Sequence, residues 1–261
     1  MNSSSSYAER LAARIELTGS RLCVGLDPRP ELHGDVDGVR QFLRQVVEET
    51  YRFAACYKPN SAYFESMGGA GFDLLAEVAT WSRSAEVPVI LDCKRGDIGT
   101  TQKQYAKMAY DFIGADAVTL SPYMGRDSIE PFLETPGKGV YLLGLTSNPG
   151  AADLQLQSTA DGRSVFEIVC QMAESTENAG LVLGLTQADP EVFSRIPDVP
   201  LLMPGLGAQG GDLAALAGQD RKAPVVINVS RGILYKEPHR SFQDKAEQFA
   251  EQIASVLPAE S

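Results

Sequence analysis

Charged residues gather in a short segment that could act on a substrate through electrostatics. Asp92 and Lys94 are two residues apart, and a strand would place both side chains on the same face. Asp97 follows Gly96, where the chain turns, and Lys58 ends an earlier apolar run. If these runs lie side by side, two cations and two anions alternate, and each charge has an opposite partner even when partly buried. Such an array can stabilise developing negative charge and supply a proton. A salt-bridge network that closes the fold is the structural alternative.

A glycine-rich stretch followed by an arginine indicates a phosphate site. Residues 205–211 follow one apolar run, and Arg231 follows the next. Backbone N–H groups of a glycine loop and a guanidinium bind phosphate well, and Gln209 could add a side-chain donor. The stretch also matches the GxGxxG dinucleotide pattern, but it follows the seventh apolar run rather than the first, and the acidic Asp220 lies in a polar turn. We therefore expect a phosphorylated small molecule rather than a dinucleotide.

Eight short apolar runs alternate with longer amphipathic stretches. The runs are apolar throughout, which is typical of strands buried on both faces of a parallel sheet. The predicted strands are 22–26, 54–58, 87–92, 117–120, 140–146, 181–186, 201–203 and 225–229. The predicted helices are 38–53, 71–85, 101–113, 164–178 and 211–218. This order predicts an α/β fold, a closed (β/α)8 TIM barrel, with its functional groups at the carboxyl ends of the strands.

The chain length fits one such barrel. It has 261 residues, and no change in composition indicates a second domain. We predict a single (β/α)8 barrel domain over residues 1–261, with short flexible tails at the polar start and at the end. Residues 148–163 are the longest irregular stretch and follow a strand end, so an active-site loop is expected there.

Composition argues against several classes of function. A formal net charge of −11 disfavours nucleic-acid binding, which needs basic patches, although a local pocket can still be positive. The four cysteines form no CxxC pair and the two histidines lie in polar stretches, so free buried thiols and no metal site are predicted. No apolar stretch has the length of a signal-peptide core or a membrane span. We therefore expect a cytoplasmic protein without a membrane partner.

Six segments resemble motifs of the orotidine 5'-phosphate decarboxylase family. The most specific is the Asp-x-Lys-x-x-Asp-Ile signature, which is similar to the sequence from Asp92 to Ile98. The other five segments are 24–30, 57–65, 146–150, 203–211 and 228–232, and all six occur in the family's order. The Cys-Lys-Arg-Gly-Asp-Ile form of the signature resembles the longer bacterial subgroup of the family, type 2.

The resemblance implies a homodimeric barrel that converts orotidine 5'-monophosphate (OMP) to UMP and CO2. This is the last step of de novo UMP biosynthesis, and the family performs it without a cofactor. The implied catalytic residues are Lys58, Asp92, Lys94 and Asp97. Asp92 would lie against the substrate carboxylate, and Lys94 would donate the proton. Asp97 would act in the active site of the partner subunit.

The resemblance also implies the residues that bind the nucleotide. They are assigned to the ribose, the pyrimidine, the phosphate and the partner subunit's site. Asp27 and Lys58 would contact the ribose hydroxyls. Ser147 would contact the pyrimidine, and Pro204 would line the loop there. Gln209 and Arg231 would hold the phosphate. Ile98 and Thr101 would join Asp97 in the partner subunit's site.

Three other functions are compatible with the same residues. A related decarboxylase of 3-keto-gulonate 6-phosphate shares the Asp-x-Lys-x-x-Asp pattern but uses Mg²⁺, so retained activity in EDTA would exclude it. A Schiff-base aldolase would use Lys58 or Lys94 covalently, which borohydride trapping would detect. A non-catalytic barrel that binds a phosphorylated ligand is the third, although simple binding has no need of four alternating charges.

Overall fold

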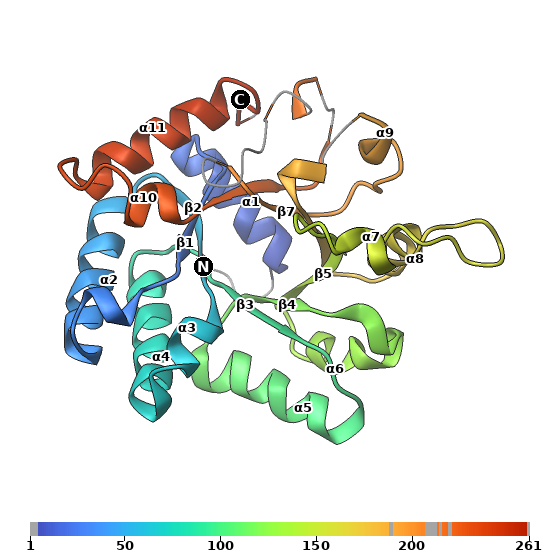
Figure 1. The fold of residues 1–261 in the computed structure, drawn as a ribbon, viewed down its shortest axis with the longest axis horizontal. Coiled ribbons are helices and arrows are strands. Elements are labelled where there is room, and N and C mark those ends of the chain that lie inside the picture. The colour runs from blue at the N-terminus through green and yellow to red at the C-terminus, as the bar shows by residue number, and fades with distance from the viewer. Residues whose placement is uncertain (1–4, 188–189, 207–212, 214–215, 219–220, 260–261) are drawn as a thin grey trace.

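The computed structural model describes residues 5–187, 190–206, 213, 216–218 and 221–259, and it contains a parallel barrel surrounded by helices (Figure 1). The strands are β1 Leu22–Leu26, β2 Ala54–Pro59, β3 Ile90–Arg95, β4 Ala117–Leu120, β5 Gly139–Leu145, β6 Ala179–Leu183, β7 Leu201–Pro204 and β8 Val225–Val229. They are hydrogen-bonded in the order β2-β1-β8-β7-β6-β5-β4-β3, and every pair is parallel. Parallel bridges from Tyr57 to Val89 and from Asn60 to Asp92 join the two edges. The predicted (β/α)8 TIM barrel is therefore confirmed.

Helices follow the strands and cover the outside of the barrel, as Figure 1 shows. The α-helices are α1 Tyr7–Thr18, α2 Val36–Thr50, α3 Ser61–Glu65, α4 Gly68–Ser84, α5 Gly99–Lys107, α6 Glu130–Leu133, α7 Ala151–Leu154, α8 Val165–Glu174, α9 Pro190–Phe193, α10 Arg231–Leu234 and α11 Phe242–Ala254. A π-helix, Met108–Ile113, continues α5. Short 3-10 turns lie at Pro30–Leu32, Pro122–Met124, Arg126–Ser128 and Leu185–Gln187. No helix in these described ranges is long and apolar enough to cross a bilayer.

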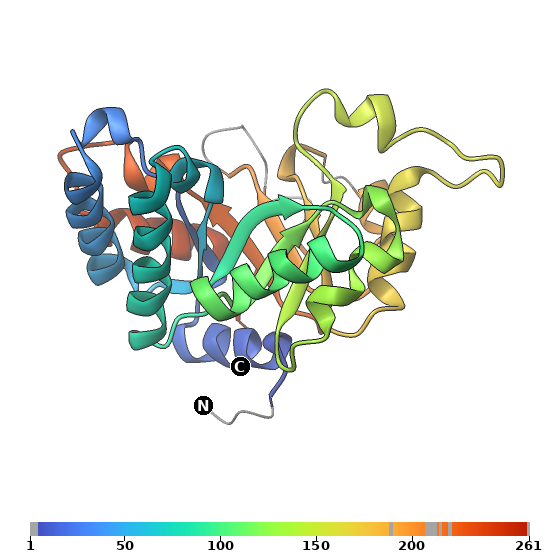
Figure 2. The same ribbon diagram turned by 90° about the horizontal axis from the view of Figure 1, so that it is seen from below.

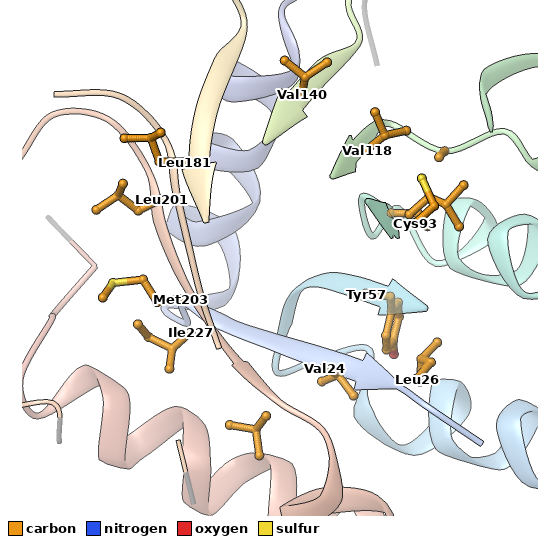
Figure 3. Packing of buried hydrophobic residues seen from close by; sticks show 14 of the residues in the cluster. Val24, Leu26, Tyr57, Cys93, Val118, Val140, Leu181, Leu201, Met203 and Ile227 are labelled. Atoms are coloured by element: carbon orange, nitrogen blue, oxygen red, sulfur yellow. The ribbon is translucent and has the colours of Figure 1, made fainter. Parts of the chain in front are cut away.

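Alternate strand residues belong to two separate hydrophobic cores, because successive strand side chains point to opposite faces. One core lies between the strands and the surrounding helices. Figure 3 shows part of it, with Val24, Val118 and Leu181 from three different strands. The other core fills the barrel interior and includes Cys56 and Ile90. Residues two positions further along the same strands therefore also face inward, at the carboxyl ends.

The helix α1 covers the amino-terminal ends of the strands. Its residues Tyr7 and Leu11 belong to the interior core, and the hydroxyls of Tyr7 and Tyr141 lie 3.2 Å apart. Ser6 begins the helix with a capping box that satisfies free N–H groups of the first turn. Figure 2 shows α1 beneath the strands. This helix was not among the predicted ones, and its apolar face is buried under the barrel.

Several element boundaries differ from the predictions. The third strand was expected at 87–92, but β3 runs from Ile90 to Arg95 and therefore includes Lys94. The expected helix 101–113 is divided into α5 and the π-helix, and α11 was not predicted. Half of the residues of the expected helix 211–218 lie outside the described residues.

Candidate active site

Asp92 on β3 is the centre of a charged cluster at the carboxyl end of the barrel. Lys58 Nζ donates to Asp92 Oδ2 at 2.7 Å, and Lys94 Nζ donates to Asp92 Oδ1 at 2.5 Å. Thr119 Oγ1 on β4 also donates to Asp92 Oδ1, at 3.0 Å. The side chains of Lys58 and Asp92 are only 6 % and 9 % exposed, whereas that of Lys94 is 47 % exposed. One buried carboxylate therefore serves two ammonium groups, and one of these remains accessible.

The alternation of side chains along the strands explains why Lys58 and Asp92 meet. Cys56 and Ile90 face the interior, so Lys58 and Asp92, two residues further along, face it at the next level. The pairing of Asn60 with Asp92 brings β2 and β3 together at this level. The sequence prediction that Lys58, Asp92 and Lys94 converge describes what the structure contains.

The lysines and the carboxylate hold one another in the charged form. Burial would lower the pKa of Lys58, but the carboxylates of Asp92 and Asp27 outweigh burial and raise that pKa above its usual value. Burial would raise the pKa of Asp92, but Lys58 and Lys94 outweigh it and hold the pKa well below its usual value. The cluster is therefore a fixed array of charges at neutral pH, suited to a reaction in which charge develops next to it.

The array lies in the wall of a cavity of about 470 Å³. Both polar and apolar side chains line this cavity, and they come from six strands and from the segment that follows β5. The lining residues are Lys58, Asp92, Lys94, Thr119, Leu143, Thr146, Ser147, Asn148, Gln155, Val182, Leu202 and Pro204. Ser147 and Pro204, both predicted to lie at the pyrimidine, are thus in the same cavity as the charges. A site with an apolar floor and a few placed polar groups is typical of small-ligand binding.

Gln155 holds the loop after β5 next to the cavity. Its Oε1 accepts from the backbone N–H of Thr146 at 2.8 Å, and its Nε2 donates to Thr146 Oγ1 at 2.8 Å. Thr146 Oγ1 in turn donates to Asn148 Oδ1 at 2.7 Å. Residues 148–163, expected to be irregular, contain α7 and return to the barrel through Gln155. The predicted role as an active-site loop fits this position, since the first residue of the loop, Asn148, and Gln155 near its middle both line the cavity.

A second polar region lies where β1 and β8 end. Tyr235 accepts a hydrogen bond from the Arg29 backbone N–H at 2.8 Å and donates to the carbonyl of Asp27 at 3.2 Å. Asp27 Oδ1 is buried and has no hydrogen-bond partner within the described residues. Arg231 begins α10 directly after β8 and is exposed. Neither Asp27 nor Arg231 lines the cavity described above, whereas Lys58, the other residue predicted to contact the ribose, does.

Within one chain, Asp97, Ile98 and Thr101 do not line the cavity that contains the array. The Asp97 carboxylate accepts from the Ile98 N–H at 2.8 Å, and no ion pair joins Asp97 to another side chain of the described residues. Ile98 is 57 % exposed, and Thr101 on the first turn of α5 is also exposed. Gln209 lies outside the described residues.

Two residues of the site were missed by the sequence analysis. Thr119 is a polar residue within an otherwise apolar predicted strand, and that interruption was a usable signal. Gln155 lies in an irregular stretch without any pattern that could have indicated its contact with Thr146.

The cysteines agree with the sequence prediction. All four are buried and free, and burial raises the pKa of the Cys93 thiol to about 11. Thiols in this form are poor nucleophiles at neutral pH. Across the described ranges, no group of three or more His, Cys, Asp or Glu side chains is arranged to hold a metal ion.

The sequence matches one protein family over most of its length. The family described as "Orotidine 5'-phosphate decarboxylase / HUMPS family" matches residues 20–244. An orotidine 5'-phosphate decarboxylase from Roseiflexus castenholzii is 42 % identical over 256 residues, which cover 92 % of this chain and 93 % of that protein.

Solved structures of similar proteins have the same architecture. An OMP decarboxylase from Leishmania donovani has a TM-score of 0.84 and 37 % identity, with 96 % of this chain and 98 % of that chain covered. A UMP synthase from the same organism has a TM-score of 0.86 and 38 % identity. The match covers 97 % of this chain but only 56 % of the synthase chain.

Proposed function

The chain belongs to the orotidine 5'-phosphate decarboxylase / HUMPS family, and from this premise we propose that it removes CO2 from OMP to form UMP. The observation that carries the proposal is the buried Asp92 carboxylate, held between Lys58 and Lys94 in the wall of a cavity. Loss of CO2 from C6 of the pyrimidine leaves an electron pair with no neighbouring carbonyl to delocalise it. An array of fixed charges is one way to stabilise that electron pair without a cofactor.

The roles of the three central residues follow from their charges and exposure. Asp92 repels the substrate carboxylate, and this repulsion ends when the C6–CO2 bond breaks. The electron pair stays on C6, and the Lys94 ammonium, which is half exposed towards the cavity, stabilises it and then transfers a proton to C6. Lys58 is buried and donates to Asp92, which keeps the carboxylate ionised and in place.

The nucleotide is bound by groups on both sides of the array. Ser147 and Pro204 contact the pyrimidine, and their place in the cavity wall supports this assignment. Asp27 binds the ribose hydroxyls, which would satisfy its buried and otherwise unpartnered oxygen. Arg231 and Gln209 bind the phosphate, and the binding energy of this distant group helps to hold the pyrimidine against the charges.

We further propose that two copies of the chain form a homodimer in which Asp97 acts in the partner subunit's site. Ile98, Tyr123 and Met124 follow β3 and β4 and are 57 %, 79 % and 51 % exposed, an apolar group that a dimer could cover. Thr101 would accompany Asp97. The assignment to the longer bacterial subgroup, the single domain over residues 1–261 and the cytoplasmic location stay predictions.

The direct test of the activity is spectroscopic. Purified protein with EDTA is mixed with OMP, and the fall in pyrimidine absorbance reports turnover. We expect Lys94→Ala to abolish turnover while the variant still folds and binds UMP. The matched control is Lys103→Ala, because Lys103 is also half exposed and forms an ion pair, with Glu134, away from the cavity. Failure of the wild type with EDTA, or near-normal turnover of Lys94→Ala, contradicts the proposal.

Mixing two inactive variants tests the shared site. Lys94→Ala and Asp97→Ala are unfolded together and refolded, so that hybrid dimers form. If Asp97 serves the partner, each hybrid has one intact site, and with half of the dimers hybrid about one quarter of wild-type sites return. If Asp97 serves its own subunit, no intact site forms in any hybrid, and the mixture stays inactive.

A further inference from the structure

The hydroxyl of Thr119 connects the carboxylate of Asp92 to the backbone of Lys94. Thr119 Oγ1 donates to Asp92 Oδ1 at 3.0 Å, and the Lys94 backbone N–H donates to the same Oγ1 at 3.0 Å. An ionised carboxylate only accepts hydrogen bonds, so the single hydroxyl proton points to Asp92 and the oxygen lone pairs receive the Lys94 N–H. Thr119 is 1 % exposed; its bond to Asp92 is buried, and the bond that it accepts from the Lys94 N–H is partly buried.

The strand β3 bulges at the place where this hydroxyl lies. Leu91 pairs with Val118, and the next paired residues are Arg95 and Leu120. Between these two pairs the chain advances by four residues in β3 but by only two in β4. Lys94 lies inside the bulge and has a φ of 46°. Residues other than glycine rarely adopt this left-handed backbone conformation. Bulges redirect side chains, and here the bulge brings Lys94 Nζ back onto the carboxylate of Asp92.

The bulge depends on a side chain for one of its backbone hydrogen bonds. In a regular parallel ladder, the Lys94 N–H would find a carbonyl of the neighbouring strand. In the bulge it finds the Thr119 hydroxyl instead. The same hydroxyl restrains Asp92 Oδ1, the oxygen that Lys94 Nζ also contacts. One group on β4 therefore fixes both the carboxylate and the backbone that carries the ammonium.

We propose that Thr119 is a positioning residue that holds Asp92 and Lys94 in the geometry needed for proton transfer to the substrate. This inference rests on the decarboxylase function proposed above. The side chain of Lys94 is half exposed, so its direction depends strongly on its backbone. Without the hydroxyl, the partly buried Lys94 N–H loses its hydrogen-bond partner, and the left-handed conformation loses its support. The ammonium then spends less time over the reacting carbon.

The test compares Thr119→Val, which removes the hydroxyl and keeps the branched shape, with Thr119→Ser, which keeps the hydroxyl. We expect kcat of Thr119→Val to fall about 10–100-fold, the loss typical of a small misplacement of a reacting group. The KM for OMP and the affinity for UMP should stay at the wild-type values. Thr119→Ser should recover most of kcat.

Thr50→Val is the matched control for loss of a buried threonine hydroxyl. Thr50 is 0 % exposed, and its Oγ1 donates to the Val46 carbonyl at 2.6 Å and lies 2.9 Å from the Tyr57 hydroxyl, away from the cavity. We expect this variant to unfold more easily but to keep the wild-type kcat. A loss of kcat in Thr50→Val equal to that in Thr119→Val would mean that any buried hydroxyl has this effect, and the inference would be overturned.

Other results would also overturn the inference while the wild type remains an active decarboxylase. One is a wild-type kcat in Thr119→Val. The second is an effect confined to KM, or a Thr119→Ser variant as slow as Thr119→Val. The third needs no activity: a crystal structure of Thr119→Val in which Lys94 keeps its positive φ and its contact with Asp92. If Thr119→Val does not fold by circular dichroism, Thr119→Ala takes its place with the same expectations.

Discussion

Replacing Asp92 with asparagine should destabilise the protein far more than replacing Lys94 with alanine, although both changes remove the ion pair between Lys94 and Asp92. Asp92→Asn leaves the buried ammonium of Lys58 without its closest opposite charge. Lys94→Ala leaves Asp92 paired with Lys58 and bonded to Thr119. The two variants therefore separate the contribution of the array to folding from its contribution to the reaction.

The exposed fractions of the side chains set the expected magnitudes. Lys58 and Asp92 are 6 % and 9 % exposed, and removing one partner of a buried pair costs about 3–5 kcal/mol. The carboxylate of Asp27 also acts on Lys58, so we expect the lower end, about 3 kcal/mol, for Asp92→Asn. Lys94 is 47 % exposed, where solvent screens the pair, and Lys94→Ala should cost about 0–1 kcal/mol.

Urea unfolding at pH 7, followed by circular dichroism, measures these free energies, provided that unfolding is reversible. The double variant Lys58→Met/Asp92→Asn is the control, because an apolar side chain of similar length removes the stranded charge. It should recover most of the stability lost in Asp92→Asn. The reasoning is refuted if Asp92→Asn is as stable as the wild type, or if the double variant is no more stable than Asp92→Asn alone.

Two further predictions concern pH and the region beside the array. Asp92 has a lowered pKa, so its contribution is present above about pH 4 and is lost as pH falls through its value in the folded protein. Lys58 has a raised pKa, so its contribution is lost only as pH rises above about 10.5. The difference in unfolding free energy between the wild type and Lys58→Met/Asp92→Asn should therefore be constant from about pH 5 to 9 and decrease in acid. Urea titrations at several pH values measure this difference. A difference that stays constant down to about pH 2 contradicts the prediction. Tyr235→Phe removes the hydroxyl that holds the backbone of Asp27 and Arg29, and should cost about 1–2 kcal/mol and raise KM for OMP more than it lowers kcat. Unchanged steady-state kinetics in that variant would remove Tyr235 from the support of the ribose site.

The barrel and the central charges were predictable because both depend on local patterns. Apolar runs separated by amphipathic stretches indicate parallel strands with covering helices, and the carboxyl ends of such strands meet at one end of the barrel. The spacing of Asp92 and Lys94 indicated a shared face, and Lys58 had to lie nearby if its run formed the neighbouring strand. The fold and the inward direction of Lys58 and Asp92 need only the period of a strand and the order of the elements, whereas the contact of Lys94 with Asp92 also depends on the bulge in β3.

Contacts between distant segments could not be predicted in the same way. The helix α1 was missed because its role depends on the hollow end of a barrel that closes only in three dimensions, where Tyr7 meets Tyr141. Gln155 reaches Thr146 across a loop whose path has no repeating pattern. The relation of Asp97 to any site depends on a second chain.

The sequence by itself determined which residues carry charge, in what order they follow the strands, and to which family they are similar. Only the tertiary structure decided that Asp92 would be shared by two lysines, and that a bulge in β3 opposite Thr119 would bring Lys94 onto it. The physical reason is that strand period sets the direction of a side chain, whereas register between strands depends on how all neighbouring side chains pack together.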